Sequence, residues 1–185
     1  MQRLQSLDPA DAPAKSAELL GDIVQRRGSA GPMVSAMANS PALLQGYLDF
    51  SRAMKRVKLP RALSEKISLA LQEWIGCALC LQAHTQAARS AGLSDNNIAL
   101  ARQGTSTDRR EAALIAYAVR VLAEPASIGD EDVAELRRHG WSDQLIADTV
   151  GLVSLNLLTG SFNLVAGLEP APAEQSTKEK HDHVG

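Results

Sequence analysis

Apolar residues recur at helical spacing along most of the chain, and prolines and glycines divide this pattern into helix-length segments. Within each segment the apolar residues lie three or four positions apart, which places them on one face of an α-helix. No stretch alternates apolar and polar residues between hairpin turns, as strands would. The predicted helices cover residues 14–26, 41–57, 60–75, 77–91, 108–122, 130–140 and 142–165. The pattern therefore predicts an all-α protein.

Two short segments of the chain resemble each other, namely residues 92–98 (GLSDNNI) and residues 140–146 (GWSDQLI). Each contains a glycine that can end a helix, an apolar residue, a serine that can cap the next helix, and a second apolar residue. We expect the two apolar residues of each segment to pack together as a hydrophobic staple. The segments are interpreted as an internally repeated helix pair. Two unrelated staples are the alternative, because staples are common.

The composition is that of one soluble globular domain. A chain of 185 residues can bury one sizeable core and is short for two. Aromatic residues make up only 3%, so the core must consist mainly of aliphatic side chains, of which Ala and Leu favour helices. The formal net charge of −2 gives no reason to expect a nucleic acid as partner.

The distribution of apolar and polar segments suggests where the protein acts and how it is organised. No apolar run reaches the roughly 18 residues needed to cross a bilayer, and the N-terminal residues lack the apolar stretch of a secretory signal. We therefore expect a cytoplasmic protein. Residues 1–31 are expected to form a partly helical N-terminal segment, residues 32–168 the domain, and the polar residues 169–185 a disordered tail.

The chain's two cysteines and one of its histidines are close in sequence. Cys77, Cys80 and His84 stand at positions i, i+3 and i+7, which share one face of a helix. A Cys-x-x-Cys pair at the start of a helix can form a disulfide, and its first thiol lies near unpaired backbone N–H groups that favour the thiolate. The histidine lies one turn further on, close enough to exchange a proton with Cys80. The pattern predicts a thiol–disulfide oxidoreductase.

Three other interpretations of the cysteine pair remain. Both cysteines can be small buried hydrophobic residues on an Ala- and Leu-rich helix. With His84 they can also be three ligands of a zinc ion, although no second Cys-x-x-Cys supplies the rest of a site and the other histidines are at 139, 181 and 183. A thioredoxin-like site is the third interpretation, and it requires a βαβ setting that this sequence lacks.

A carboxylate would complete the proton relay by orienting His84. On an unbroken helix Glu73, four residues before Cys77, would share its face, whereas Glu65 would lie about 120° away. Gly76 stands between these residues and Cys77 and can end the first helix. If it does, the first helix can present another face, so the spacing leaves both glutamates open.

The chain resembles the AhpD-like, carboxymuconolactone decarboxylase superfamily from about residue 32 to residue 167. The resemblance rests on a glutamate, Glu65, followed twelve residues later by the segment Cys77-Ala-Leu-Cys80-Leu-Gln-Ala-His84 and preceded there by a glycine. It implies an AhpD-like helical bundle with a repeated helix pair, assembled as homotrimers or hexamers. It also selects Glu65 over Glu73.

The resemblance further implies a reaction. Cys80 matches the peroxide-reactive cysteine, Cys77 the cysteine that resolves its sulfenic acid as a disulfide, and His84 and Glu65 the proton relay. The implied activity is that of an alkyl hydroperoxide reductase without metal or cofactor, reduced by a dithiol or a peroxiredoxin-type protein. Leu79 departs from the pattern, because peroxidase members carry a second histidine there. A carboxymuconolactone decarboxylase-type non-redox enzyme and a redox sensor without turnover are the alternatives.

Overall fold

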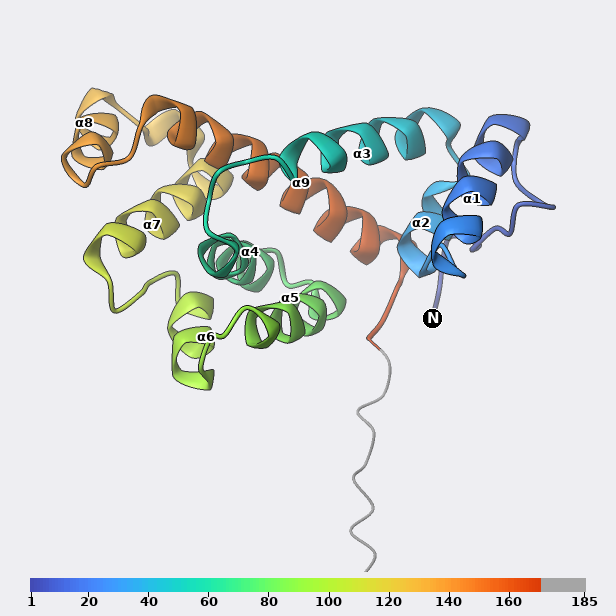
Figure 1. Cartoon of the computed structure of the whole chain (residues 1–185), viewed down its shortest axis with the longest axis horizontal. Coiled ribbons are helices and arrows are strands. Elements are labelled where there is room, and N and C mark those ends of the chain that lie inside the picture. The colour runs from blue at the N-terminus through green and yellow to red at the C-terminus, as the bar shows by residue number, and fades with distance from the viewer. Residues whose placement is uncertain (171–185) are drawn as a thin grey trace, which may run out of the picture.

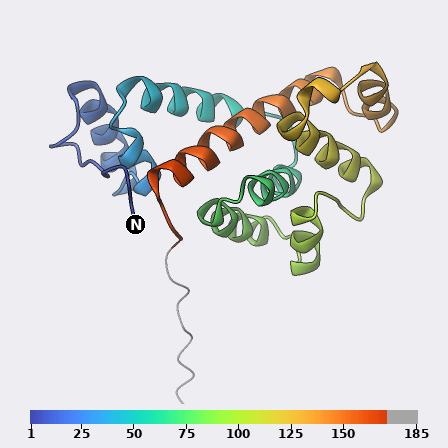
Figure 2. The same cartoon turned by 180° about the vertical axis from the view of Figure 1, so that it is seen from behind.

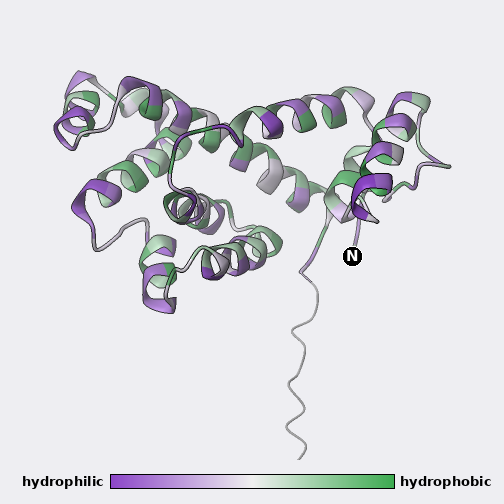
Figure 3. Cartoon of the chain, in the orientation of Figure 1, coloured by the Kyte–Doolittle hydropathy of each residue, from purple (hydrophilic) through white to green (hydrophobic). Residues whose placement is uncertain are grey.

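The computed structural model describes residues 1–170, and within them all regular structure is helical (Figure 1). The all-α prediction is confirmed. The helices are α1 (Ala14–Arg27), α2 (Pro32–Met37), α3 (Pro41–Met54), α4 (Arg61–Ile75), α5 (Ala78–Ser90), α6 (Asp95–Arg102), α7 (Arg109–Ala123), α8 (Asp130–Arg138) and α9 (Asp143–Ala166), with a 3-10 turn at Pro125–Ser127. Along each helix hydrophobic residues are interspersed with hydrophilic ones, as Figure 3 shows.

Gly76 separates α4 from α5, as the sequence suggested. Its φ of 81° is in the left-handed region, and its N–H donates to the carbonyl of Gln72 at 2.9 Å, which ends α4. Because the chain turns there, α5 packs back against α4 and does not extend it. A residue about three turns upstream of Gly76, such as Glu65, can therefore face α5.

The two similar segments form the same turn. Gly92 and Gly140 both have positive φ, 86° and 81°, and the serine two residues after each glycine caps the following helix. The first turn joins α5 to α6 and the second joins α8 to α9. The apolar residues of the first turn share one buried cluster and those of the second share another, as a hydrophobic staple requires.

Helix α9 is the longest helix of residues 1–170 and packs against α3, α4 and α7. Figure 2 shows it running diagonally through the molecule, with α2 at its C-terminal end and α7 and α8 toward its N-terminal end. By length and composition α9 could span a membrane, although polar residues interrupt its apolar sequence. Its buried polar side chains Asn156 and Asn163 face α4 and α5 and bond there, so α9 is built into the helical core.

The N-terminal segment packs onto the far end of α9. A second hydrophobic cluster joins Leu20 of α1 and Met37 of α2 with Leu44 of α3, and Phe162 of α9 packs against it. The N–H of Arg3 donates to the carbonyl of Ala166 at 2.7 Å, which fixes the start of the chain to the end of α9. The predicted tail falls almost entirely outside the described residues, together with His181 and His183.

Candidate active site

Cys77 and Cys80 form a disulfide at the start of α5. Cys77 is the N-cap residue of the helix, and its sulfur accepts a hydrogen bond from the backbone N–H of Cys80 at 3.2 Å. This N–H is one of the donors that the first turn of a helix leaves unpaired, so the helix start stabilises negative charge on sulfur. The interpretation of the two cysteines as separate buried hydrophobic residues is therefore wrong.

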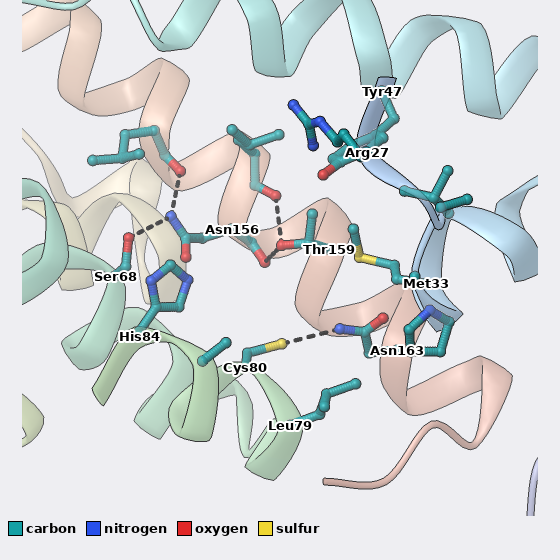
Figure 4. Close-up of a pocket in the computed structure, with 17 residues that line it drawn as sticks. Arg27, Met33, Tyr47, Ser68, Leu79, Cys80, His84, Asn156, Thr159 and Asn163 are labelled. Atoms are coloured by element: carbon teal, nitrogen blue, oxygen red, sulfur yellow. Dashed lines mark hydrogen bonds between the residues drawn. The ribbon is translucent and has the colours of Figure 1, made fainter. Parts of the chain in front are cut away.

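The two sulfur atoms differ in access. Cys80 lines a cavity of about 460 Å³, whereas Cys77 does not, and the two residues are 8% and 1% exposed. Residues of six helices and of the α1–α2 loop surround the cavity (Figure 4). The lining consists of Arg27, Ala30, Gly31, Pro32, Met33, Val34, Tyr47, Ser68, Leu79, Cys80, Ala83, His84, Leu152, Leu155, Asn156, Thr159 and Asn163. A molecule in the cavity can therefore reach Cys80 but not Cys77.

His84 lines the same cavity one turn after Cys80 and contacts Glu65 of α4. Its Nδ1 lies 2.8 Å from Oε2 of Glu65, and both side chains are largely buried. In the neutral tautomer that donates from Nδ1 to the carboxylate, Nε2 is left as the basic nitrogen. Glu73 instead accepts a hydrogen bond from Arg102 at 2.7 Å on the surface. The turn at Gly76 thus brings Glu65, and not Glu73, to the histidine.

Asn163 of α9 is a site residue that the sequence interpretation missed. Its Nδ2 donates to the sulfur of Cys80 at 3.3 Å, and its Oδ1 has no hydrogen-bond partner within residues 1–170. The side chain is 4% exposed and lines the cavity, so this oxygen can accept a hydrogen bond from a bound molecule. The available signal was a pair of asparagines, Asn156 and Asn163, seven residues apart on a predominantly apolar helix.

A buried polar network holds α9 at this distance from α4. Nε2 of Gln72 donates to the backbone carbonyl and to Oδ1 of Asn156, and Nδ2 of Asn156 donates to Ser68. Gly160 permits the close approach, because a Cβ there would lie 2.6 Å from Oε1 of Gln72 and 3.0 Å from Ile75. These contacts set where Asn163 meets Cys80.

Within the described residues no group of three or more His, Cys, Asp or Glu side chains is placed to hold a metal ion. Cys77, Cys80 and His84 therefore form no three-ligand zinc site as they stand, and the sulfurs are bonded to each other. The geometry is that of a disulfide beside a histidine–carboxylate pair.

Residues 41–124, which run from α3 to the end of α7, match the model of the carboxymuconolactone decarboxylase family. This part of the chain is therefore similar to the carboxymuconolactone decarboxylase family, as the sequence resemblance predicted. The matched residues include the glutamate, both cysteines and the histidine of the site, but neither Arg27 nor Asn163. No curated protein is significantly similar to the chain in sequence.

Several solved structures share the fold of this chain. A peroxidase-related protein with an alkylhydroperoxidase AhpD core from Ralstonia eutropha JMP134 has a TM-score of 0.78 at 19% identity, over 92% of each chain. A peroxidase-related protein from Silicibacter sp. TM1040 has a TM-score of 0.75 at 19% identity, over 91% of this chain and 90% of that one. The debrominase Bmp8 has a TM-score of 0.69 at 19% identity, over 90% of each chain. These likenesses confirm an AhpD-like helical fold.

Proposed function

We propose that the protein is a thiol-dependent peroxidase that reduces organic hydroperoxides through the Cys77–Cys80 pair. The observation that carries the proposal is the unequal access of the two sulfurs. Cys80 faces the cavity beside His84, whereas its disulfide partner is sealed behind it. A substrate can therefore reach the sulfur of Cys80, whereas the sulfur of Cys77 can react only with Cys80. The two steps of a thiol peroxidase require this arrangement.

In the first step the thiolate of reduced Cys80 attacks the terminal oxygen of the hydroperoxide. The S–O bond forms as the O–O bond breaks, and the alkoxide leaves as the alcohol after taking a proton. Asn163 donates to the attacking sulfur, and the His84–Glu65 pair accepts the thiol proton and returns it to the leaving oxygen. Cys80 is oxidised to the sulfenic acid and the hydroperoxide is reduced by two electrons.

In the second step the thiol of Cys77 attacks the sulfur of the sulfenic acid. The disulfide forms and water leaves, so the enzyme reaches the state seen in this structure. A donor thiolate must then attack Cys80, because Cys77 is buried, and Cys77 leaves as the thiol. The second donor thiol releases the donor disulfide. The donor is therefore a dithiol whose sulfur can enter the cavity, and a reducing compartment such as the cytoplasm would supply one.

Thiol titration and mass spectrometry test the proposal. One equivalent of cumene hydroperoxide added to the reduced protein should consume two thiols and give a Cys77–Cys80 disulfide. Cys77→Ser should stop at a sulfenic acid on Cys80 that dimedone traps, and Cys80→Ser should not react. A Cys80→Ser protein that consumes peroxide at the wild-type rate would overturn the assignment.

The alternatives from the sequence give different results in the same assays. A non-redox decarboxylase that uses His84 and Glu65 as acid and base should keep its activity when both cysteines are replaced by serine. A redox sensor should form the disulfide once and show no steady-state consumption of hydroperoxide with a dithiol donor such as dithiothreitol.

Reductive dehalogenation is a second candidate, supported by the shared fold of the debrominase Bmp8, which has also been solved in complex with 2,3,4-tribromopyrrole. The Cys80 thiolate would take bromine from carbon, the resulting carbanion would accept a proton, and Cys77 would displace bromide as the disulfide forms. Release of bromide from a brominated pyrrole at a rate above that of hydroperoxide consumption would favour this reaction.

We also propose that the protein assembles as a homotrimer or hexamer, as the superfamily resemblance implies. Exposed apolar residues follow one face of α9 at seven-residue spacing, namely Val150, Leu157 and Leu164. An open groove beside them is lined by Leu158, Phe162 and Val165. A second copy that covers this face would remove the largest exposed apolar side chains of α9 from water.

A further inference from the structure

The cavity that contains Cys80 is lined by groups that can carry positive charge and by no acidic side chain. Arg27 is its permanent cation, His84 pairs with Glu65, which does not line the cavity, and none of the lining residues is Asp or Glu. The rest of the lining is mostly apolar, including Met33, Val34 and Leu155. Apolar walls weaken the screening of a charge, so the cavity favours a ligand that is anionic at one end and apolar elsewhere.

Arg27 has no partner for its charge. Its guanidinium forms no ion pair or hydrogen bond within residues 1–170, whereas the adjacent Arg26 bonds to its own helix and pairs with Asp22. Arg27 is the last residue of α1, and Gly28, with a φ of 81°, turns the chain directly after it. After this turn, residues 30 and 31 of the α1–α2 loop line the cavity. Arg27 therefore stands at the cavity wall with an unused planar donor group.

Tyr47 lies beside Arg27 on the same wall, on the opposite side of the cavity from Cys80 and Leu79 (Figure 4). Burial raises the pKa of the Tyr47 phenol, while a hydrogen bond with Ser51 and the charge of Arg27 act to lower it. The net shift is upward, so the phenol is protonated at neutral pH and can donate a hydrogen bond.

A second cavity lies on the other side of these two residues and increases the positive potential there. Arg27 and Tyr47 line both cavities. The second cavity, of about 340 Å³, adds Arg26, Arg52 and Lys55. Arg26 pairs with Asp22 and Arg52 with Asp49, so Lys55 is the added cation without an ion pair within residues 1–170. The unpaired cations Arg27 and Lys55 therefore lie at the end of the first cavity that is remote from Cys80.

We propose that the substrate is an amphipathic organic carboxylate that carries the reacting group at its apolar end. The guanidinium of Arg27 and the phenol of Tyr47 bind the carboxylate, for which the planar guanidinium offers two parallel donors. The apolar part of the substrate then packs against the aliphatic side chains that line the cavity between Arg27 and Cys80. That the reacting group is a hydroperoxide rests on the proposed function, whereas binding of the carboxylate does not. Arg27 of α1 lies outside the residues that match the family model, whereas Tyr47 lies within them.

The kinetic test compares three hydroperoxides that share one apolar body: cumene hydroperoxide, its para-carboxy derivative and the methyl ester of that derivative. The wild-type protein should show kcat/KM about tenfold higher for the carboxylate than for the ester. Arg27→Gln should bring this ratio close to one, and Arg27→Lys should keep part of it. Arg56→Gln is the matched control, because Arg56 is exposed, unpaired within the described residues and lines neither cavity, and it should keep the wild-type ratio.

A binding test separates the substrate class from the reaction. Calorimetry with para-isopropylbenzoate, which has no peroxide bond, should show binding that Arg27→Gln weakens about tenfold and Arg56→Gln does not. Binding that depends on Arg27 without turnover of any hydroperoxide would support the carboxylate site and overturn the peroxidase. Turnover with equal kcat/KM for carboxylate and ester, and no binding of the benzoate, would overturn the carboxylate site and leave the peroxidase.

Discussion

Nδ2 of Asn163 donates a hydrogen bond to the sulfur of Cys80 at 3.3 Å and lies 4.0 Å from the sulfur of Cys77. The bond joins the last turns of α9 to the first turn of α5, across 83 residues of sequence. A donor that faces sulfur stabilises the thiolate more than the thiol, because hydrogen bonds to a charged acceptor are the stronger ones. Asn163 is therefore placed to activate Cys80.

Asn163→Leu should slow the reaction of Cys80 with hydroperoxide about tenfold at neutral pH, because the thiolate loses its side-chain donor. The pH at which half of the reduced Cys80 reacts as thiolate should rise, as iodoacetamide alkylation at a series of pH values would measure. Ser154→Ala, an exposed change on the same helix, is the control. If the pH midpoint of alkylation were the same in Asn163→Leu as in the wild type, the amide of Asn163 would not stabilise the thiolate.

Glu65→Gln should reduce peroxide consumption by about 10² or more, because His84 keeps a hydrogen-bond partner but loses the charge that stabilises its protonated form. Stopped-flow mixing of reduced protein with cumene hydroperoxide would measure the first oxidation step directly. Glu73→Gln is a matched control, since Glu73 bonds to Arg102 on the surface of the same helix. Equal losses in the two variants would contradict the proton relay.

The local parts of this site were predictable from the sequence. Gly76 marks the break between two helices, and the spacing of Cys77, Cys80 and His84 puts them on one face because a helix fixes neighbours three and four residues apart. Spacing alone could not decide between Glu65 and Glu73, since the direction in which α5 folds back depends on the Gly76 turn. The resemblance to a family selected Glu65, and it is the one that contacts His84.

The remote parts of the site were not predictable in the same way. Asn163 reaches Cys80 only because Gly160 and the Gln72–Asn156 contact set the distance between α4 and α9, which no local pattern encodes. Arg27 joins the cavity because the N-terminal segment packs on the end of α9 through a separate hydrophobic cluster. Tertiary packing, and not helix periodicity, places both residues.

A charged residue on the exposed face of α9 tests the proposed assembly. Leu157→Glu should convert the oligomer to a smaller species, because a carboxylate would be buried without a partner at the interface. Size-exclusion chromatography with light scattering would measure the molar mass. Asn96→Glu, on the exposed side of α6, should leave the mass unchanged. A wild-type protein that is monomeric at micromolar concentration would contradict the assembly.

Gly160→Ala should lower the free energy of unfolding by about 1–3 kcal/mol, since the new Cβ would overlap a fully buried side chain. That Cβ would lie 2.6 Å from Oε1 of Gln72, and moving this amide away would break the hydrogen bond that its Nε2 donates to Asn156. Gly46→Ala in α3 is the matched control, because a Cβ there meets no atom within 4 Å. It should raise the free energy of unfolding by about 0.5–1 kcal/mol, as alanine favours the helix. Urea unfolding followed by circular dichroism would give both values. If Gly160→Ala were as stable as Gly46→Ala, α9 would not be held against α4 by this contact, and the distance from Asn163 to Cys80 would need another cause.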